Sequence, residues 1–175
     1  MDGARLGAAL AGHQNDLTLE DIGLLTDAFW IGGTKVGALL GEAIVITNPS
    51  LAEDFAFHIK QRGGLLAKGR ILGLQFHELF GPTDLFFNLA RHSTAMAKKL
   101  ATGIAKAGYA LAADTETNQV FPILPNALIE SLNKSFAFYV WEKRGQHSSV
   151  IRLVTSWATE EAQVDRLVEA INAFP

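Results

Sequence analysis

The feature that most constrains this chain is a pair of short apolar runs flanking a glycine-rich segment that carries one lysine. The runs are DAFWIGG, residues 27–33, and EAIVIT, residues 42–47, and Lys35 lies between them. Apolar runs of this length, bounded by glycines, are typical of buried strands. We therefore expect Lys35 to lie in a buried, apolar place, although structural lysines belong on surfaces. Burial favours a neutral amine, and a neutral amine can attack a carbonyl.

Composition limits the classes of protein to which the chain can belong. It has 175 residues, 49% of them hydrophobic and 19% charged, with a formal net charge of -3 and no cysteine. This is ordinary globular composition, long enough for one domain or for a domain with a smaller lobe. The absence of a basic tract gives no reason to expect a nucleic-acid partner. Without cysteine, disulfides and thiolate zinc sites are excluded.

The amino-terminal residues MDGARLGAAL show no cleavable apolar core, and no apolar run reaches the ~20 residues of a bilayer span. We therefore expect a cytoplasmic protein without a membrane partner. The five histidines form no ligand pair on one helical face, so no metal site is expected. The segment GGTKVG also lacks the order of glycines and lysine found in a phosphate-binding Walker loop.

The hydrophobic pattern predicts an α/β chain in which short strands alternate with helices. Helices are expected at residues 4–11, 17–25, 48–63, 65–80, 84–108, 125–134 and 160–174. Beyond the two runs beside Lys35, strands are expected at residues 109–113, 120–124, 136–142 and 150–157. For the helix at residues 48–63, Ser50 should be the cap and Gly63 should lie near the end. The Gly81-Pro82 pair is the best candidate for a boundary, which predicts domains at 1–82 and 83–175.

Asp2 and Lys35 are the residue types that pyridoxal phosphate (PLP) chemistry requires. A lysine amine can bind the cofactor's aldehyde, while a carboxylate that pairs with the pyridine nitrogen keeps the ring an electron acceptor. Small residues beside the lysine would let a bulky cofactor lie close to the backbone. They are Gly32, Gly33, Gly37 and Ala38. The spacing alone is a weak signal, because any aspartate and lysine can lie 33 residues apart.

Three segments carry a resemblance to a known family. They are DGARL at the amino terminus, LTDAFWIGGTKVGALLGEAIVI around Lys35, and IRLVTSW near the end. Together they closely resemble the threonine aldolase and β-eliminating lyase family, which are PLP enzymes of the aspartate aminotransferase fold. The resemblance implies that residues 1–82 are the C-terminal part of the PLP-binding large domain. Residues 83–175 would be the small C-terminal α+β domain.

The resemblance also implies roles for individual residues. Lys35 would be the Schiff-base lysine, and Asp2 would pair with the pyridine nitrogen. Arg5 would face the cofactor's phenolic oxygen or the substrate carboxylate, with a plain surface position as the alternative. Arg152 would bind the substrate carboxylate, because a guanidinium offers two parallel hydrogen bonds to a carboxylate.

The segment GGLLAKGR supports a softer assignment. Family members carry a basic residue here that reaches the cofactor phosphate, often in the neighbouring subunit. Lys68 and Arg70 both have the required charge. Each could equally be a solvated helix residue.

The match covers only the C-terminal half of such an enzyme, so the isolated chain is expected to be catalytically incomplete. Its expected partners are a small amino-acid substrate and a complementary N-terminal polypeptide, further copies of itself, or both. Many family members have a histidine where this chain has Ser156. That difference leaves two reactions open, cleavage of a β-hydroxy amino acid to glycine and an aldehyde, and β-elimination. A fragment without chemistry, acting only as an assembly piece, is the alternative from another class.

Overall fold

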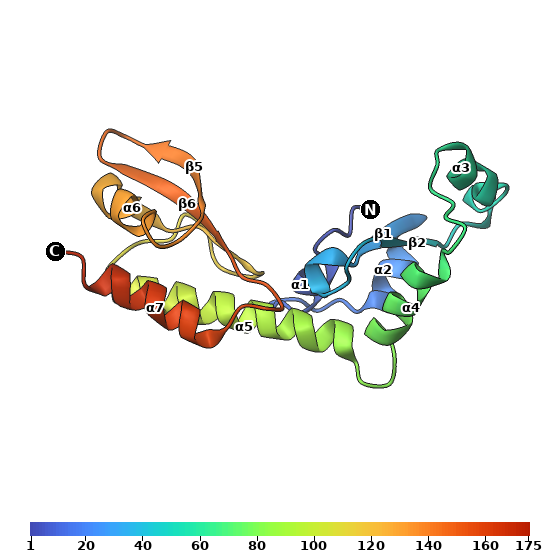
Figure 1. Ribbon diagram of the computed structural model, residues 1–175, viewed down its shortest axis with the longest axis horizontal. Coiled ribbons are helices and arrows are strands. Elements are labelled where there is room, and N and C mark those ends of the chain that lie inside the picture. Colours follow the sequence, from blue (N-terminus) through green and yellow to red (C-terminus); the bar gives the residue numbers. More distant parts are fainter. The chain divides into compact units, whose positions relative to one another are not determined.

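The computed structural model describes every residue from Met1 to Pro175 and divides the chain into two compact units. The first comprises Met1–Ala11 and Asn15–Ala90, and the second comprises Gly12–Gln14 and Arg91–Pro175. The long helix α5 (Leu85–Lys106) contributes to both units (Figure 1). None of the helices is both long enough and apolar enough to cross a bilayer. The predicted domain division at residue 82 stays a prediction.

The first unit contains two β-strands, six short helices and the first residues of α5. In chain order its elements are α1 (Leu6–Leu10), α2 (Leu19–Leu25), β1 (Ala28–Gly32), η1 (Thr34–Val36), β2 (Glu42–Ile46), η2 (Pro49–Leu51), α3 (Phe55–Gln61) and α4 (Arg70–Leu79). Its core is a cluster of buried apolar side chains from α1, α2, β1, η1, α4 and α5. They are Leu6, Ile22, Phe29, Ile31, Val36, Leu79, Phe86 and Ala90.

The start of α2 is fixed by a capping box. The Thr18 hydroxyl accepts a hydrogen bond from the Asp21 amide, and the Asp21 carboxylate accepts one from the Thr18 amide. This reciprocal pair satisfies donors that a helix start leaves unpaired. The hydrogen bonds from Thr18 lower the pKa of the Asp21 carboxyl, because they favour its charged form.

The two strands beside Lys35 form as predicted, but only β1 is buried. β1 and β2 pair antiparallel, from Ala28 opposite Ile46 to Gly32 opposite Glu42. β1 buries Phe29 and Ile31, whereas no residue of β2 is buried. The expectation of a buried β2 was therefore wrong, because β1 is the only strand that pairs with β2.

The predicted helix at residues 48–63 is divided in two. Asn48, rather than Ser50, is the cap, since its side-chain oxygen accepts from the Ser50 amide at 3.1 Å. Asp54 has a φ of 54°, a left-handed conformation that separates η2 from α3. Gly63, with a φ of 73°, follows the end of α3 as predicted.

The second unit is built around strand β6. Its elements after α5 are β3 (Gln119–Val120), β4 (Ile123–Pro125), α6 (Asn126–Leu132), β5 (Tyr139–Arg144), β6 (Ser148–Val154) and α7 (Glu161–Asn172). β6 pairs antiparallel with β3, β4 and β5. Figure 1 shows β5 and β6 as a hairpin beside α6. Ile151 and Leu153 of β6 join the buried core of this unit.

Two predicted strands of the second unit differ from the structure. The stretch at residues 109–113 forms only an isolated bridge, Leu111 with Pro122. The strand expected at residues 120–124 is interrupted, and β3 and β4 lie on either side of the break. Pro122 stands at the break because proline has no N–H to donate to a ladder. Its carbonyl still accepts from the Ile151 amide at 3.1 Å.

Helices α5 and α7 are held together by charge and by close packing. The Lys99 ammonium lies 2.5 Å from an Asp165 oxygen and 2.7 Å from a Glu161 oxygen. Hydrogen bonds to Asp165 and then Glu161 raise the pKa of Lys99, because they favour its charged form. Gly103 of α5 faces Val168, and a Cβ added to Gly103 would lie 2.5 Å from a Val168 methyl carbon.

We expect Gly103→Ala to destabilise the protein by about 1–3 kcal/mol, because the new methyl group overpacks against a branched side chain. Thermal unfolding would measure the change. Gly73→Ala in α4 is the matched control, since nothing lies within 4 Å of the added Cβ. That control should gain roughly 0.5–1 kcal/mol from helix propensity. Equal effects of the two substitutions would contradict the packing role of Gly103.

Candidate functional site

The first three residues run along β1 and thereby place Asp2. The Met1 amino group donates to the Ala28 carbonyl at 2.7 Å, and the Trp30 amide donates to the Met1 carbonyl at 3.4 Å. The Gly32 amide donates to the Gly3 carbonyl at 3.0 Å. Both partners of these bonds advance together along the chain, which is the pattern of parallel strands. A Cβ added to Gly3 would lie 1.7 Å from the Trp30 carbonyl oxygen, so only glycine allows this approach.

Asp2 and Arg5 line the same groove of about 420 Å³, and their contact with a cofactor stays a prediction. Asp2 is exposed, and its Oδ1 accepts from the Ala4 amide at 2.8 Å. Arg5 stands at the start of α1, and its Nε is buried without a hydrogen-bond partner. Asn15 and Leu17 also line this groove. A buried unpaired donor beside an exposed carboxylate suits a ligand that carries both an acceptor and a proton.

Lys35 lies in η1, three residues after the end of β1, and its side chain is exposed. The expectation that Lys35 is buried was therefore wrong for this chain. The following residue, Val36, takes the buried position and packs in the core of the first unit. Residues 1–3 and β1 run parallel, so the segments that follow them begin at the same end of this pair. The start of α1 follows residues 1–3, and the turn with Lys35 follows β1.

The glycines around Lys35 have a structural reason that the sequence did not reveal. Gly33 is crowded, because an added Cβ would lie 2.9 Å from the Ala38 Cβ and 3.0 Å from both the Gly41 carbonyl and the Phe76 ring. Gly37 and Gly41 have φ values of 102° and 92°, which favour glycine. These residues shape the turn between β1 and β2. Space for a cofactor is not needed to explain them.

Gln75 of α4 holds the turn that carries Lys35, and sequence reasoning missed it. Its Oε1 accepts from the Leu39 amide at 2.6 Å, and its Nε2 donates to the Leu40 carbonyl at 3.4 Å. The side-chain amide thereby satisfies one backbone donor and one backbone acceptor of the turn. A polar residue on the apolar pattern of α4 was the only available signal.

Lys68 lies in the turn before α4, and Arg70 is the first residue of α4. Both side chains are exposed. Neither lines the groove of Asp2 and Arg5. Their contact with a cofactor phosphate stays a prediction.

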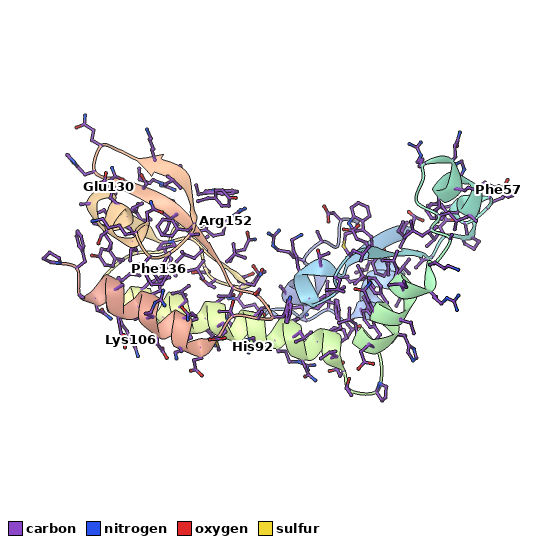
Figure 2. The ribbon with its side chains drawn as sticks, in the orientation of Figure 1. Phe57, His92, Lys106, Glu130, Phe136 and Arg152 are labelled. Carbon is purple, nitrogen blue, oxygen red and sulfur yellow. The ribbon has the colours of Figure 1, made fainter.

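Arg152 lies on β6 directly opposite Tyr139 of β5 and is partly buried. Its guanidinium carbon lies 5.4 Å from the centre of the Tyr139 ring and 5.2 Å from that of Trp141. Arg152 also lines a groove of about 560 Å³ with Phe136 and Phe138. Figure 2 labels Arg152 on the hairpin and Phe136 near α6.

A buried polar cluster fixes the strand that carries Arg152. The Thr155 amide donates to the Asn118 carbonyl at 3.0 Å, and the Asn118 side-chain amide donates to the Thr155 carbonyl at 2.6 Å. The Thr155 hydroxyl donates to the Ser93 carbonyl at 2.7 Å. Ser156 accepts through its hydroxyl from the Ala158 amide at 3.2 Å, so it shapes the turn after β6. Asn118 was also missed from the sequence, because its partner lies 37 residues away.

The chain is 36% identical over 149 residues to the low specificity L-threonine aldolase of a Pseudomonas species, and 34% identical over 148 residues to that of Pseudomonas aeruginosa. Its fold matches a solved threonine aldolase of Leishmania major with a TM-score of 0.93 and 48% identity. The chain is a relative of the threonine aldolases. The predicted resemblance to their C-terminal half is thereby confirmed.

The chain spans about half the length of the threonine aldolases that it matches. Coverage is 84% and 83% of this chain against 42% and 41% of the two Pseudomonas enzymes, and 97% against 49% of the Leishmania protein. No protein-family profile matches the chain.

More distant structures extend the fold comparison. A serine palmitoyltransferase of Sphingomonas wittichii matches with a TM-score of 0.64 at 16% identity, over 98% of this chain and 45% of that one. A structure of SPT with PLP internal aldimine matches with a TM-score of 0.58 at 14% identity, over 84% of this chain and 39% of that one. The predicted α/β fold class, part of a PLP-dependent transferase-like architecture, is confirmed by these neighbours.

We expect Gln75→Met to loosen the turn that carries Lys35, at a cost of about 1 kcal/mol for a lost hydrogen bond. Hydrogen exchange at the Leu39 amide would measure the change, and the exchange should become faster. Gln75→Glu is the matched control, because it keeps the oxygen that accepts from Leu39. Unchanged protection of Leu39 in the Gln75→Met variant would remove Gln75 from this role.

Proposed function

We propose that this chain is the lysine-bearing part of a PLP-dependent aldehyde-lyase that cleaves a β-hydroxy amino acid to glycine and an aldehyde. The observation that carries the proposal is the threonine aldolase likeness across 97% of the chain, with Lys35, Asp2, Arg5 and Arg152 all present in the motifs. The low specificity named for the two Pseudomonas enzymes supports a range of β-hydroxy amino acids as substrates.

The residues of the first unit fit the cofactor. The unpaired buried Nε of Arg5 is a donor that a phenolic oxygen can satisfy. Asp2 uses Oδ1 for the Ala4 amide, and Oδ2 can still accept the proton of a pyridine nitrogen. When bound, PLP supplies an electron sink for the bond-breaking at the substrate's Cα.

The chain's own residues then have separate tasks. Lys35 would hold the cofactor covalently through its amine, and Gln75 supports the turn after Lys35 through its bonds to Leu39 and Leu40. Asp2 holds a proton at the pyridine nitrogen, and Arg5 orients the ring. Lys68 or Arg70 offers a positive charge to the cofactor phosphate.

Arg152 binds the substrate carboxylate in this proposal. Its Nε is buried and unpaired, and no acidic side chain forms an ion pair with it. Such a guanidinium keeps the two parallel donors that a carboxylate requires. Ser156 replaces the histidine of many family members, so β-elimination is the competing reaction.

We also propose that the active enzyme includes a further polypeptide segment, in the same or another chain, and that it is an oligomer. The relatives are about twice as long as this chain. The first unit exposes large apolar side chains, among them Leu39 at 88% and Leu24 at 80%. We infer that another polypeptide covers some of these side chains, because large exposed apolar surfaces are typical of interaction sites.

Borohydride reduction of the PLP-loaded assembly should fix the cofactor on Lys35, as read by peptide mass spectrometry. Lys35→Ala should abolish the label and the absorbance of lysine-bound PLP, because Lys35 is the lysine that the resemblance assigns to the cofactor. Lys60→Ala in α3 is the control and should keep the label on Lys35, because Lys60 is exposed and has no role in the proposed site. A label retained in the Lys35→Ala variant would refute the assignment. The products decide the reaction, since glycine and an aldehyde mean cleavage, whereas a 2-oxo acid and ammonia mean elimination.

Sedimentation at micromolar concentration tests the assembly. We expect species heavier than the single chain, because the exposed apolar surface of the first unit favours association. A compact, monodisperse species of 18.9 kDa that unfolds cooperatively would show that the chain needs no partner.

A further inference from the structure

Two aromatic rings meet the guanidinium of Arg152, and the pairing of β5 with β6 explains how. Tyr139 lies directly opposite Arg152, so their side chains share one face of the sheet. The ladder is irregular between Val140 and Glu142, which makes Trp141 the extra residue of a bulge. A bulge redirects a side chain, and here the Trp141 ring lies 5.2 Å from the guanidinium carbon.

No carboxylate shares this position. Glu142, the nearest acid along β5, is engaged by Arg144, whose Nε lies 3.1 Å from a Glu142 oxygen. The Arg152 Nε is buried and unpaired. The rings therefore hold a cation whose charge and donors remain available to a ligand.

We propose that Tyr139 and Trp141 are positioning residues that hold the Arg152 guanidinium against their rings, ready to donate to one carboxylate of an amino-acid ligand. The inference rests on the proposed function, in which Arg152 is the carboxylate-binding residue. It adds two residues of β5 that act on the ligand only through Arg152.

The physical reason is preorganisation. An arginine side chain has many rotamers, and ordering it when a ligand binds weakens the binding. Aromatic faces attract the guanidinium without neutralising it, so they fix its plane in advance. A carboxylate in the same position would also fix the plane, but it would occupy the donors that the ligand needs.

A second arginine in this unit shows the contrast. Arg166 of α7 lies over Phe136, with 5.1 Å from its guanidinium carbon to the ring centre. It meets a single ring and has no buried unpaired nitrogen. Of the two arginines, only Arg152 contacts two aromatic rings and has a buried, unpaired Nε.

The test uses the full chain in the assembled state in which it purifies. Phenylglyoxal modifies arginines, and peptide mass spectrometry follows each arginine separately. The reaction is run alone, with N-acetylglycine, and with N-acetylglycinamide, which lacks the carboxylate. The variants are Trp141→Leu and Tyr139→Leu, which remove a ring, and Tyr139→Phe, which keeps one. Val140→Ala is the control on the same strand, and Arg144 is the internal reference for folding.

We expect N-acetylglycine, but not the amide, to protect Arg152 in the wild type, in Tyr139→Phe and in Val140→Ala. Loss of either ring should raise the concentration needed for protection about threefold to fivefold, as expected for one cation–π contact at a partly exposed site. The unliganded reaction of Arg152 should also become faster relative to that of Arg144.

Equal protection in the wild type and in both ring-loss variants would overturn the inference, as would no protection of the wild type. These outcomes are separate from failure of the proposed function. If Lys35 takes the borohydride label and Arg152 is protected equally in the wild type and in both ring-loss variants, the positioning role alone is wrong. If Lys35 takes the label and Arg152 is not protected in the wild type, the carboxylate-binding role of Arg152 is wrong as well, while the PLP assignment stands. If Lys35 takes no label, the PLP assignment is wrong, whatever Arg152 shows.

Discussion

The first unit depends on one backbone contact, the approach of Gly3 to β1. The two backbone segments lie so close that position 3 must be glycine, because a Cβ added to Gly3 would lie 1.7 Å from the Trp30 oxygen. On the other side Gly32 meets the backbone of Ala4, where its own added Cβ would lie 2.7 Å from the Ala4 oxygen. With both glycines in place, β1 has backbone partners on each side, residues 1–3 and β2. The positions of Asp2, Arg5 and Lys35 all follow from this pairing, because each lies within three residues of a paired segment.

The sequence predicted element types better than it predicted burial. The strand β1, the long helix α5 and Gly63 after the end of α3 all formed where local pattern placed them. Their signals are local, since capping residues and apolar periodicity act within a few residues. Burial depends on which neighbours a segment finds, and the apolar run of β2 found a partner only in β1. The same reason explains the exposure of Lys35, because the next residue, Val36, takes the buried position in this turn.

Residues of the candidate site could be predicted from the sequence only where they lie in a recognisable motif. Lys35, Asp2 and Arg152 lie in segments whose residue types indicate chemistry, and the likeness to threonine aldolases supports them without testing their roles. Gln75 and Asn118 carry no such signal. Each acts on backbone 35 or more residues away, Gln75 at Leu40 and Asn118 at Thr155. Contacts of this kind depend on tertiary structure, and a single sequence does not reveal them.

The central place of β6 has a consequence for local opening. Strands β3, β4 and β5 all pair with it, and Ile151 and Leu153, on either side of Arg152, lie in the core of the second unit. Backbone amides in such a strand exchange with solvent only when the whole cooperative unit opens. The position of Arg152 should therefore persist through every fluctuation short of unfolding of that unit. The turn that carries Lys35 leads into β2, which pairs with β1 alone, so local opening there should cost less free energy than opening of β6.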